Sequence, residues 1–131
     1  MLDIETSVGK SRIQGMGLFA LRDFKPGEVV VAWDTSNTLS NDEYERLPED
    51  QRQYVVRYEG GWLYMLPPGR YINHSCDPNS IPLHGNDVAI RDIHLGDEIT
   101  SDYRPVMPLG ERMECKCGAS NCMGYIIGTA L

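Results

Sequence analysis

R-Y-I-N-H-S-C-D-P-N, residues 70–79, is a polar segment that follows a Pro-Pro-Gly turn. In this segment only Ile72 and Pro78 lack a polar or ionisable side chain. Small polar side chains ahead of an Asp-Pro turn can be buried only if they are hydrogen-bonded. Taken alone, His74 is therefore best interpreted as a structural histidine with its hydrogen bonds satisfied.

Two further segments carry the same ambiguity. G-D-E-I-T-S-D-Y, residues 96–103, ends a predicted strand in a tyrosine, and Tyr103 taken alone fits a half-buried residue at a strand end. G-M-G-L-F-A, residues 15–20, joins two glycines to an apolar run. This pattern predicts a tight turn that leads into a strand.

Three of the four cysteines form a C-x-C-x4-C pattern at Cys115, Cys117 and Cys122. Thiolates are soft ligands, and tetrahedral zinc requires four donors. Cys76 is the one cysteine left, so an all-cysteine site that joins the tail to residues 70–79 is the simplest closure. The alternatives are free thiols or, in a secreted protein, two disulfides. The spacing favours one structural zinc ion.

The composition is that of an ordinary globular domain. The 131 residues are 41% apolar and 24% charged, which predicts one domain with one core. No apolar run approaches the ~20 residues of a membrane-spanning helix, so we expect no membrane partner. The first ten residues, MLDIETSVGK, lack the features of a secretory signal. We therefore expect an intracellular protein, with the cytoplasm favoured and a nuclear or chromosomal location as the second choice.

The formal net charge of −7 bears on the partners. Nucleic-acid-binding proteins carry a basic face, so we expect no direct contact with nucleic acid. A negative surface suits a basic partner, such as a Lys/Arg-rich peptide. The alternative is that the charge only keeps the protein soluble.

Glycine and proline punctuate short segments, a pattern typical of a mostly β domain with many turns. The helical pattern is confined to two short segments, predicted at 41–46 and about 49–57. Ser40 or Asn41 can cap the first helix, and Pro48 separates the two.

The predicted strands are 28–33, 62–65, 88–90 and 98–100. The first of these is apolar with little alternation, so we expect it in the core. After Tyr103, Pro105 and Pro108 break the chain, and the tail then carries three cysteines. This change predicts a boundary near residue 105.

The segments 15–20, 70–79, 96–103 and 115–122 occur together and in one order. They match a G-x-G-hydrophobic-x-A turn, an R-[FY]-x-N-H-S-C-x-P-N segment, a G-[DE]-E-[IL]-T-x-D-Y segment and a C-x-C-x4-C tail. With these four marks the chain resembles the SET-domain lysine methyltransferases that carry a cysteine-rich post-SET segment. The resemblance spans about residues 8–127.

The resemblance implies a mostly β fold of several small sheets with short helices. In that fold the segment containing Asn73 and the strand ending at Tyr103 are threaded together in a knot-like arrangement. The resemblance also implies a SET catalytic core at 1–104, with inserted helices at about 40–58. A zinc-binding post-SET tail would follow at 105–131.

The resemblance further implies S-adenosylmethionine as the cofactor. Glycines let a backbone approach a ligand closely, and a side-chain amide both donates and accepts hydrogen bonds. The implied cofactor-binding residues are Gly15, Met16, Gly17, Arg70, Tyr71, Asn73 and His74. We add Tyr125, whose ring could pack over the adenine or merely on the core.

The implied activity is transfer of a methyl group to a lysine of a basic protein or peptide. Tyr103 is the implied catalytic residue, which orients the amine, and it lines the substrate channel together with Trp33 and Ser101. Relatives usually carry Phe or Tyr at the position of Ser101, and Tyr near that of Trp33. Because bulk at the first position commonly limits methylation, we expect di- or trimethyllysine as the product.

Two other classes of function fit parts of the sequence. A non-catalytic, zinc-stabilised peptide-binding module would keep the fold without turnover, and Ser101 and Trp33 would then mark a drifted pocket. A zinc-bearing scaffold would explain the cysteine tail alone. The intact Tyr103, Asn73 and His74 favour the enzyme.

Overall fold

The computed structural model describes residues 5–131. Residues 1–4, which begin both the segment compared with a secretory signal and the predicted 1–104 core, lie outside the described residues. The strands within residues 5–131 are β1 (Thr6–Lys10), β2 (Met16–Ala20), β3 (Val29–Ala32), β4 (Thr38–Leu39), β5 (Val55–Tyr58), β6 (Gly61–Tyr64), β7 (Asn73–His74), β8 (Ser80–Leu83), β9 (Asn86–Ala89), β10 (Glu98–Ser101), β11 (Arg112–Glu114) and β12 (Tyr125–Ile127). The helical elements are α1 (Asn41–Arg46), α2 (Glu49–Arg52) and the 3-10 turns η1 (Gly69–Tyr71) and η2 (Arg104–Val106). The chain is mostly β with short helices, as predicted.

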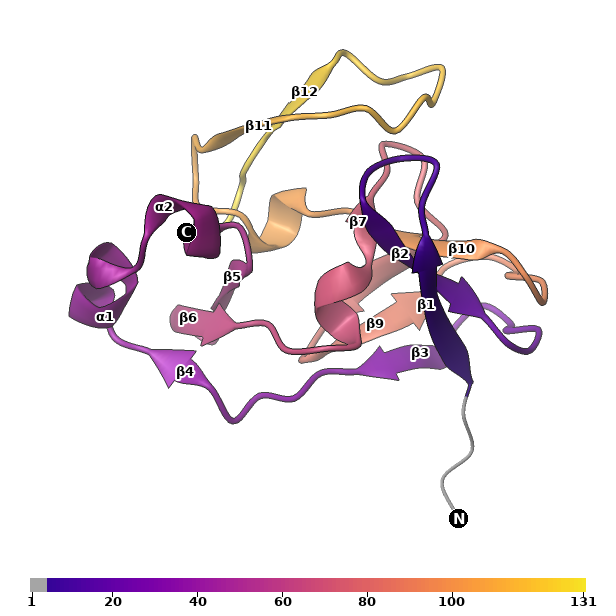
Figure 1. Cartoon of the computed structure of the whole chain (residues 1–131), viewed down its shortest axis with the longest axis horizontal. Coiled ribbons are helices and arrows are strands. Elements are labelled where there is room, and N and C mark those ends of the chain that lie inside the picture. The colour runs from indigo at the N-terminus through magenta and orange to yellow at the C-terminus, as the bar shows by residue number, and fades with distance from the viewer. Residues whose placement is uncertain (1–4) are drawn as a thin grey trace.

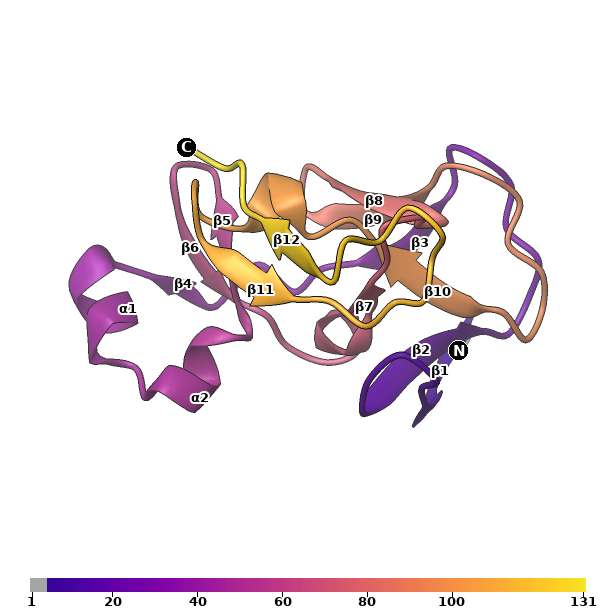
Figure 2. The ribbon, with the colours of Figure 1, turned by 90° about the horizontal axis from the view of Figure 1, so that it is seen from above.

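The described strands form three separate sheets. The largest has the order β1-β2-β10-β8-β9-β3, with β7 also paired to β10. The smaller two are β4-β6-β5 and β11-β12. Figures 1 and 2 show α1 and α2 at the opposite end of the molecule from β1 and β2. The β11-β12 pair lies along the top of Figure 1 and over the middle of the molecule in Figure 2.

Strand β10 brings the sequence motifs together. It pairs antiparallel with β2 and parallel with β7. In the parallel register Thr100 lies opposite Asn73, and Ser101 lies opposite His74. The two polar segments of the sequence therefore lie side by side, next to the strand that leaves the glycine turn.

A hydrophobic cluster fixes this arrangement. Its buried members are Leu18, Ala20, Phe24, Val30, Val31, Ile72, Ala89, Ile93 and Ile99. Leu18 of β2 and Ile99 of β10 are register partners, and both are fully buried. Burying a side chain of this size contributes about 1.5–3 kcal/mol. The cluster therefore holds the glycine turn and the end of β10 in a fixed relation.

Helix α1 begins as predicted, and α2 is shorter than predicted. The Ser40 side chain accepts a hydrogen bond from the Glu43 N–H at 3.1 Å, and Glu43 closes a capping box. The prediction of a helix over 49–57 is wrong in its second half, because residues 55–58 form β5. β-Branched and aromatic side chains there lead into a turn at Glu59-Gly60, both with positive φ, that pairs β5 with β6. None of the helices within residues 5–131 is long and apolar enough to cross a membrane.

The predicted core strand at 28–33 corresponds to β3, which lies at the edge of the large sheet and pairs with β9. Val30 and Val31 are buried as predicted. Val29 and Ala32 are exposed, so the prediction is wrong for them. The register shifts between Val29 and Val31, and such a bulge lets two consecutive residues face the core.

The tail has a hydrophobic cluster of its own, formed by Met107, Cys115 and Ile126. Tyr103 packs against this cluster from the end of the large sheet. The pairing of β11 with β12 closes the tail on itself. The tail is therefore anchored beside Tyr103, while the boundary near residue 105 stays a prediction.

Candidate functional site

Two cavities in the structure share a wall. The larger has a volume of about 450 Å³ and the smaller a volume of about 300 Å³. The residues that line both are Gln53, Tyr54, Arg70, Tyr103 and Met113. The two cavities are therefore adjacent, with these side chains between them.

The smaller cavity gathers most of the residues predicted to bind the cofactor. Its lining includes Gly15, Met16, Arg70, Tyr71, Asn73 and His74. Gly15 has a φ of +49°, and no atom lies within 4 Å of the place where a Cβ would stand. The glycine thus leaves the backbone open to close approach by a ligand. The tail adds Glu114, Cys115 and Lys116 to the same lining.

Asn73 holds the glycine turn in place. Its amide nitrogen donates hydrogen bonds to the carbonyl oxygens of Gln14 and Met16, at 3.1 and 3.0 Å. It also donates to the Glu98 carboxylate at 3.1 Å, and the Ser11 hydroxyl donates to both oxygens of that carboxylate at 2.9 and 2.8 Å. Asn73 is thus a positioning residue for the backbone that lines the smaller cavity.

Gly17 and Tyr125 lie outside the linings of both cavities. A Cβ on Gly17 would stand 2.6 Å from a carboxylate oxygen of Glu98, so glycine permits close approach within the sheet. Tyr125 stands in β12 opposite Glu114, with the Arg112 guanidinium 3.9 Å from its ring centre. Cofactor contact by these two residues stays a prediction.

His74 links Tyr103 to the cysteine cluster. It is 4% exposed, and its Nδ1 accepts a hydrogen bond from the Tyr103 backbone N–H at 3.0 Å. A neutral ring with Nδ1 as acceptor carries its proton on Nε2, which lies 3.5 Å from Cys76 Sγ. Burial lowers the pKa of His74, and Asp102 opposes this shift only in part. The neutral ring therefore positions the tyrosine backbone.

Tyr103 forms part of the wall between the cavities. Its hydroxyl donates a hydrogen bond to the Ile72 carbonyl oxygen. Burial raises the pKa of this phenol, and the carboxylates of Asp87 and Glu98 add to the shift. The hydroxyl therefore keeps its proton at neutral pH, and its lone pairs can accept a hydrogen bond from a ligand.

Trp33 and Ser101 meet at a buried carboxylate in the larger cavity. The Trp33 Nε1–H donates to Asp87 Oδ2 at 2.7 Å, and the Ser101 hydroxyl donates to Asp87 Oδ1 at 3.2 Å. Burial raises the pKa of Asp87 to about 6, although these two hydrogen bonds act to lower it. All three residues line the cavity, together with Tyr103.

Sequence patterns did not predict Glu98, Tyr54 and Asp87 as site residues. Glu98 lies within the 96–103 motif, so its position there was a usable signal. Tyr54, whose ring lies 3.8 Å beneath the Arg70 guanidinium, fell in the part of the chain wrongly predicted as helix. Asp87 is a single aspartate near a predicted strand, and no pattern distinguishes it.

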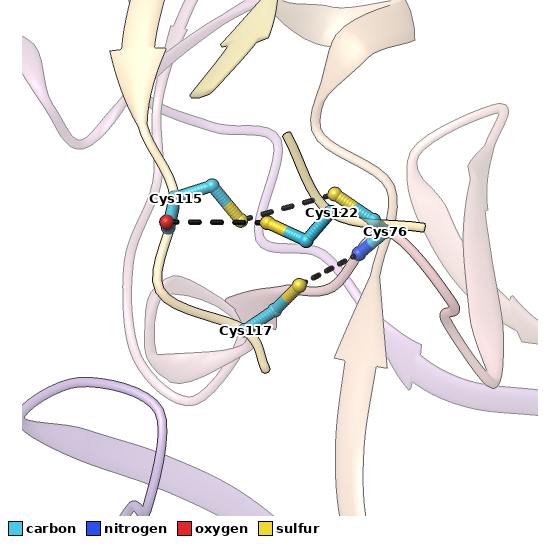
Figure 3. Close-up of side chains that lie close together, drawn as sticks. All are labelled: Cys76, Cys115, Cys117 and Cys122. Carbon is cyan, nitrogen blue, oxygen red and sulfur yellow. Dashed lines mark hydrogen bonds between the residues drawn. The ribbon is translucent and has the colours of Figure 1, made fainter. Parts of the chain in front are cut away.

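Cys76 and the three tail cysteines lie together in the structure (Figure 3). The four sulfur atoms are all within 4.8 Å of one another, and those of Cys76 and Cys115 are 3.9 Å apart. Four sulfurs around zinc, at bonds of about 2.3 Å, would stand about 3.8 Å apart, whereas a disulfide requires about 2.05 Å. The four cysteines are free thiols positioned to bind a metal ion, and donor type and spacing fit zinc.

These features define a class of protein. They are one cavity bordered by the glycine backbone, a second bordered by aromatic side chains, and a tyrosine that lines both. Residues 15–104 match the SET domain, and the chain belongs to the SET domain family.

Curated relatives agree with this family. Histone-lysine N-methyltransferase trr of Drosophila melanogaster is 29% identical over 140 residues, and set-2 of Caenorhabditis elegans is 30% identical over 135 residues. The alignments cover 91% and 89% of this chain. They cover only 6% and 9% of the relatives, so the chain spans less than a tenth of their length.

Solved structures share the fold. One, described as a candidate histone methyltransferase of Plasmodium falciparum, has a TM-score of 0.66 and 27% identity, over 78% of this chain and 95% of that chain. A humanized mutant of the Chaetomium thermophilum Polycomb Repressive Complex 2, bound to the inhibitor GSK126, has a TM-score of 0.65 and 32% identity, over 79% and 15% of the two chains. The predicted SET-type β fold of several small sheets is confirmed.

Proposed function

We propose that this chain is a protein-lysine N-methyltransferase that uses S-adenosylmethionine and acts on a basic protein, with histones as the first candidates. The wall shared by the two cavities carries the proposal, because Tyr103 borders both spaces. The names of the relatives support the reaction and the class of substrate. The net charge of −7 suits a basic partner.

The smaller cavity fits the proposed cofactor, because it combines open backbone at Gly15 with polar side chains. When bound, S-adenosylmethionine supplies an electrophilic methyl group on a sulfonium. The residues proposed to hold it are Gly15, Met16, Arg70, Tyr71, Asn73 and His74. Gly17 would keep the turn close to Glu98, and Tyr125 would be an outer contact.

The chain's own contribution to the reaction is alignment. A lysine amine attacks only when neutral, and a desolvated channel lowers its pKa. The Tyr103 hydroxyl donates to the Ile72 carbonyl, so its free lone pairs can hold an amine hydrogen in a fixed direction. Such alignment can supply up to about 7–11 kcal/mol of a reaction barrier.

We propose one structural zinc ion on Cys76, Cys115, Cys117 and Cys122. The tail lines the smaller cavity, so zinc would hold one wall of the cofactor site. This supports the division into a SET core up to residue 104 and a zinc-binding tail at 105–131. The relatives' names favour a chromosomal location over the cytoplasmic one favoured by the sequence.

A methyl-transfer assay tests the proposal. Radiolabelled S-adenosylmethionine would be incubated with the protein and core histones, beside calorimetry of cofactor binding. We expect cofactor binding and label in histone lysines. Absence of binding at millimolar cofactor would contradict the proposal, and binding without transfer to any basic protein would favour a peptide-binding module.

A further inference from the structure

Asp87 is a buried carboxylate without a positive partner. It lies in β9, is 4% exposed and lines the larger cavity. Within residues 5–131, no ion pair within 4.0 Å joins it to a lysine, arginine or histidine. An ionised carboxylate is costly to bury unpaired, and an entering cation would relieve that cost.

The carboxylate is held in a fixed orientation from two strands. Trp33 follows β3 and donates to one oxygen, and Ser101 ends β10 and donates to the other. Both donors are neutral, so they leave the negative charge uncompensated. A carboxylate offers about four acceptor positions, and two are still free for a ligand. A group fixed in advance loses little entropy when it binds.

The surroundings of Asp87 select the chemistry of the ligand. The lining of the larger cavity includes the aromatic side chains of Trp33 and Tyr103 and the thioether of Met65. These groups suit an aliphatic stem, and aromatic faces also attract a cation. The lining also holds three arginines and three further carboxylates, namely Arg52, Arg70, Arg112, Glu49, Asp102 and Glu111. An apolar stem that ends in a positive charge is the description of a lysine side chain.

We propose that Asp87, held by Trp33 and Ser101, binds the ammonium group of the incoming lysine and makes the larger cavity selective for a cationic side chain. The identity of the ligand rests on the proposed function. Ser101 then has two effects, because its small side chain frees volume and its hydroxyl positions the carboxylate. The ion pair favours the protonated amine, which cannot attack, so Asp87 strengthens substrate binding and restrains turnover.

A titration with n-butylammonium, the lysine side chain as a free molecule, tests this assignment without requiring methyl transfer. Binding is followed by the nuclear magnetic resonance signal of the Trp33 indole N–H, with uncharged 1-butanol as the second probe. Asp87→Asn keeps the size of the side chain and an acceptor for Trp33. We expect it to weaken n-butylammonium binding by about 10- to 100-fold and to abolish the preference over 1-butanol.

Asp92→Asn is the matched control. Asp92 is exposed, its carboxylate lies 3.8 Å from the Lys25 ammonium, and it does not line the larger cavity. It should leave both titrations unchanged. If Asp87→Asn does not fold, Ser101→Ala removes one hydrogen bond to the carboxylate and keeps both its charge and the Trp33 signal. That variant should also weaken n-butylammonium binding, by a smaller factor.

Kinetics on core histones separate binding from a merely structural role. Asp87→Asn should raise KM without lowering kcat, whereas a damaged fold would lower kcat as well. Equal n-butylammonium affinity in wild type and Asp87→Asn, or equal wild-type affinity for the two probes, would overturn the assignment. Charge-selective binding through Asp87 without methylation of any protein would uphold it and refute the proposed function.

Discussion

The two cavities are built from different kinds of residue. The lining of the smaller includes six residues from the segments 15–20 and 70–79, which stand out in the sequence: Gly15, Met16, Arg70, Tyr71, Asn73 and His74. The lining of the larger includes Trp33, which follows β3, and side chains from β5, β9 and the end of β10, and Asp87 among them belongs to no motif. The motifs therefore contribute to both cavities, whereas the carboxylate proposed to bind the substrate lies outside them.

The largest expected effect concerns the zinc site, whose loss should affect the smaller cavity more than the larger one. Zinc affinity in small peptides corresponds to ~10–16 kcal/mol, so Cys115→Ser or chelation should loosen residues 105–131 before the rest of the chain. Hydrogen exchange and elemental analysis measure this. Cofactor binding should fall more than n-butylammonium binding. Ser120→Ala, in the same loop, should change neither, and absence of stoichiometric metal in the pure protein would contradict the prediction.

The next effect concerns the buried carboxylate of the larger cavity. The folded-state pKa of Asp87, about 6, lies above its ordinary value of 3.8, so this group favours the folded state below pH ~4 and loses that contribution as the pH rises through about 6. The contribution of Asp87 to the free energy of unfolding therefore differs by about 3 kcal/mol between low and neutral pH. Asp87→Asn should therefore be more stable than wild type at pH 7.5 and nearly equal to it at pH 4.

Urea unfolding at these two pH values measures the difference, and the comparison cancels the other titrating groups. Equal stability gaps at both pH values would show that Asp87 has the same pKa in the folded and unfolded states. Burial would then not penalise the charge of Asp87, and a cation would gain little by pairing with it.

Asn73→Ala should weaken ligand binding in the smaller cavity alone. It removes the hydrogen bonds to the carbonyl oxygens of Gln14 and Met16, and an unsatisfied partner costs ~1–3 kcal/mol. Calorimetry should show weaker cofactor binding, with n-butylammonium binding unchanged. Asn37→Ala, on an exposed residue, is the control. A variant that binds the cofactor like wild type would remove Asn73 from the proposed site.

Ser101→Tyr should have the smallest effect on rate and a clear effect on product. The added ring would fill part of the larger cavity, so we expect monomethyllysine where the wild type yields di- or trimethyllysine. Ser101→Ala keeps the volume and loses the hydrogen bond to Asp87, so its product should match that of wild type. Mass spectrometry of a methylated peptide decides, and monomethyllysine from wild type at long times would point to Trp33 as the limit on channel size.

Sequence patterns predicted the parts of the molecule that depend on local chemistry. The turn at Gly15, the capped helix after Ser40 and the cysteine spacing each follow from residue type and separation. Because zinc requires four ligands and the tail supplies three cysteines, the sequence also predicted that Cys76 would lie beside the tail. The likeness to a family supplied the contact between the strand of Asn73 and the end of β10, which periodicity does not reveal.

Other features depend on tertiary contacts that no local pattern encodes. Residues 55–57 were predicted to be helical, but they belong to β5 because this segment pairs with β6. Val29 is exposed because of a bulge in the pairing of β3 with β9. Asp87 acquires its role only where Trp33 and Ser101 converge on it, although Trp33 lies 54 positions and Ser101 14 positions away along the chain.

Methyl transfer by wild type and Tyr103→Phe, measured side by side on core histones with radiolabelled S-adenosylmethionine, tests the central claim most directly. The substitution barely changes ring volume and removes the hydroxyl at the shared wall. We expect transfer by wild type and a rate lower by ~100-fold in the variant, because loss of positioning by about 1 Å has an effect of this size. Cofactor binding should be unchanged. Equal rates for the two proteins, or no transfer by wild type with bound cofactor, would contradict it.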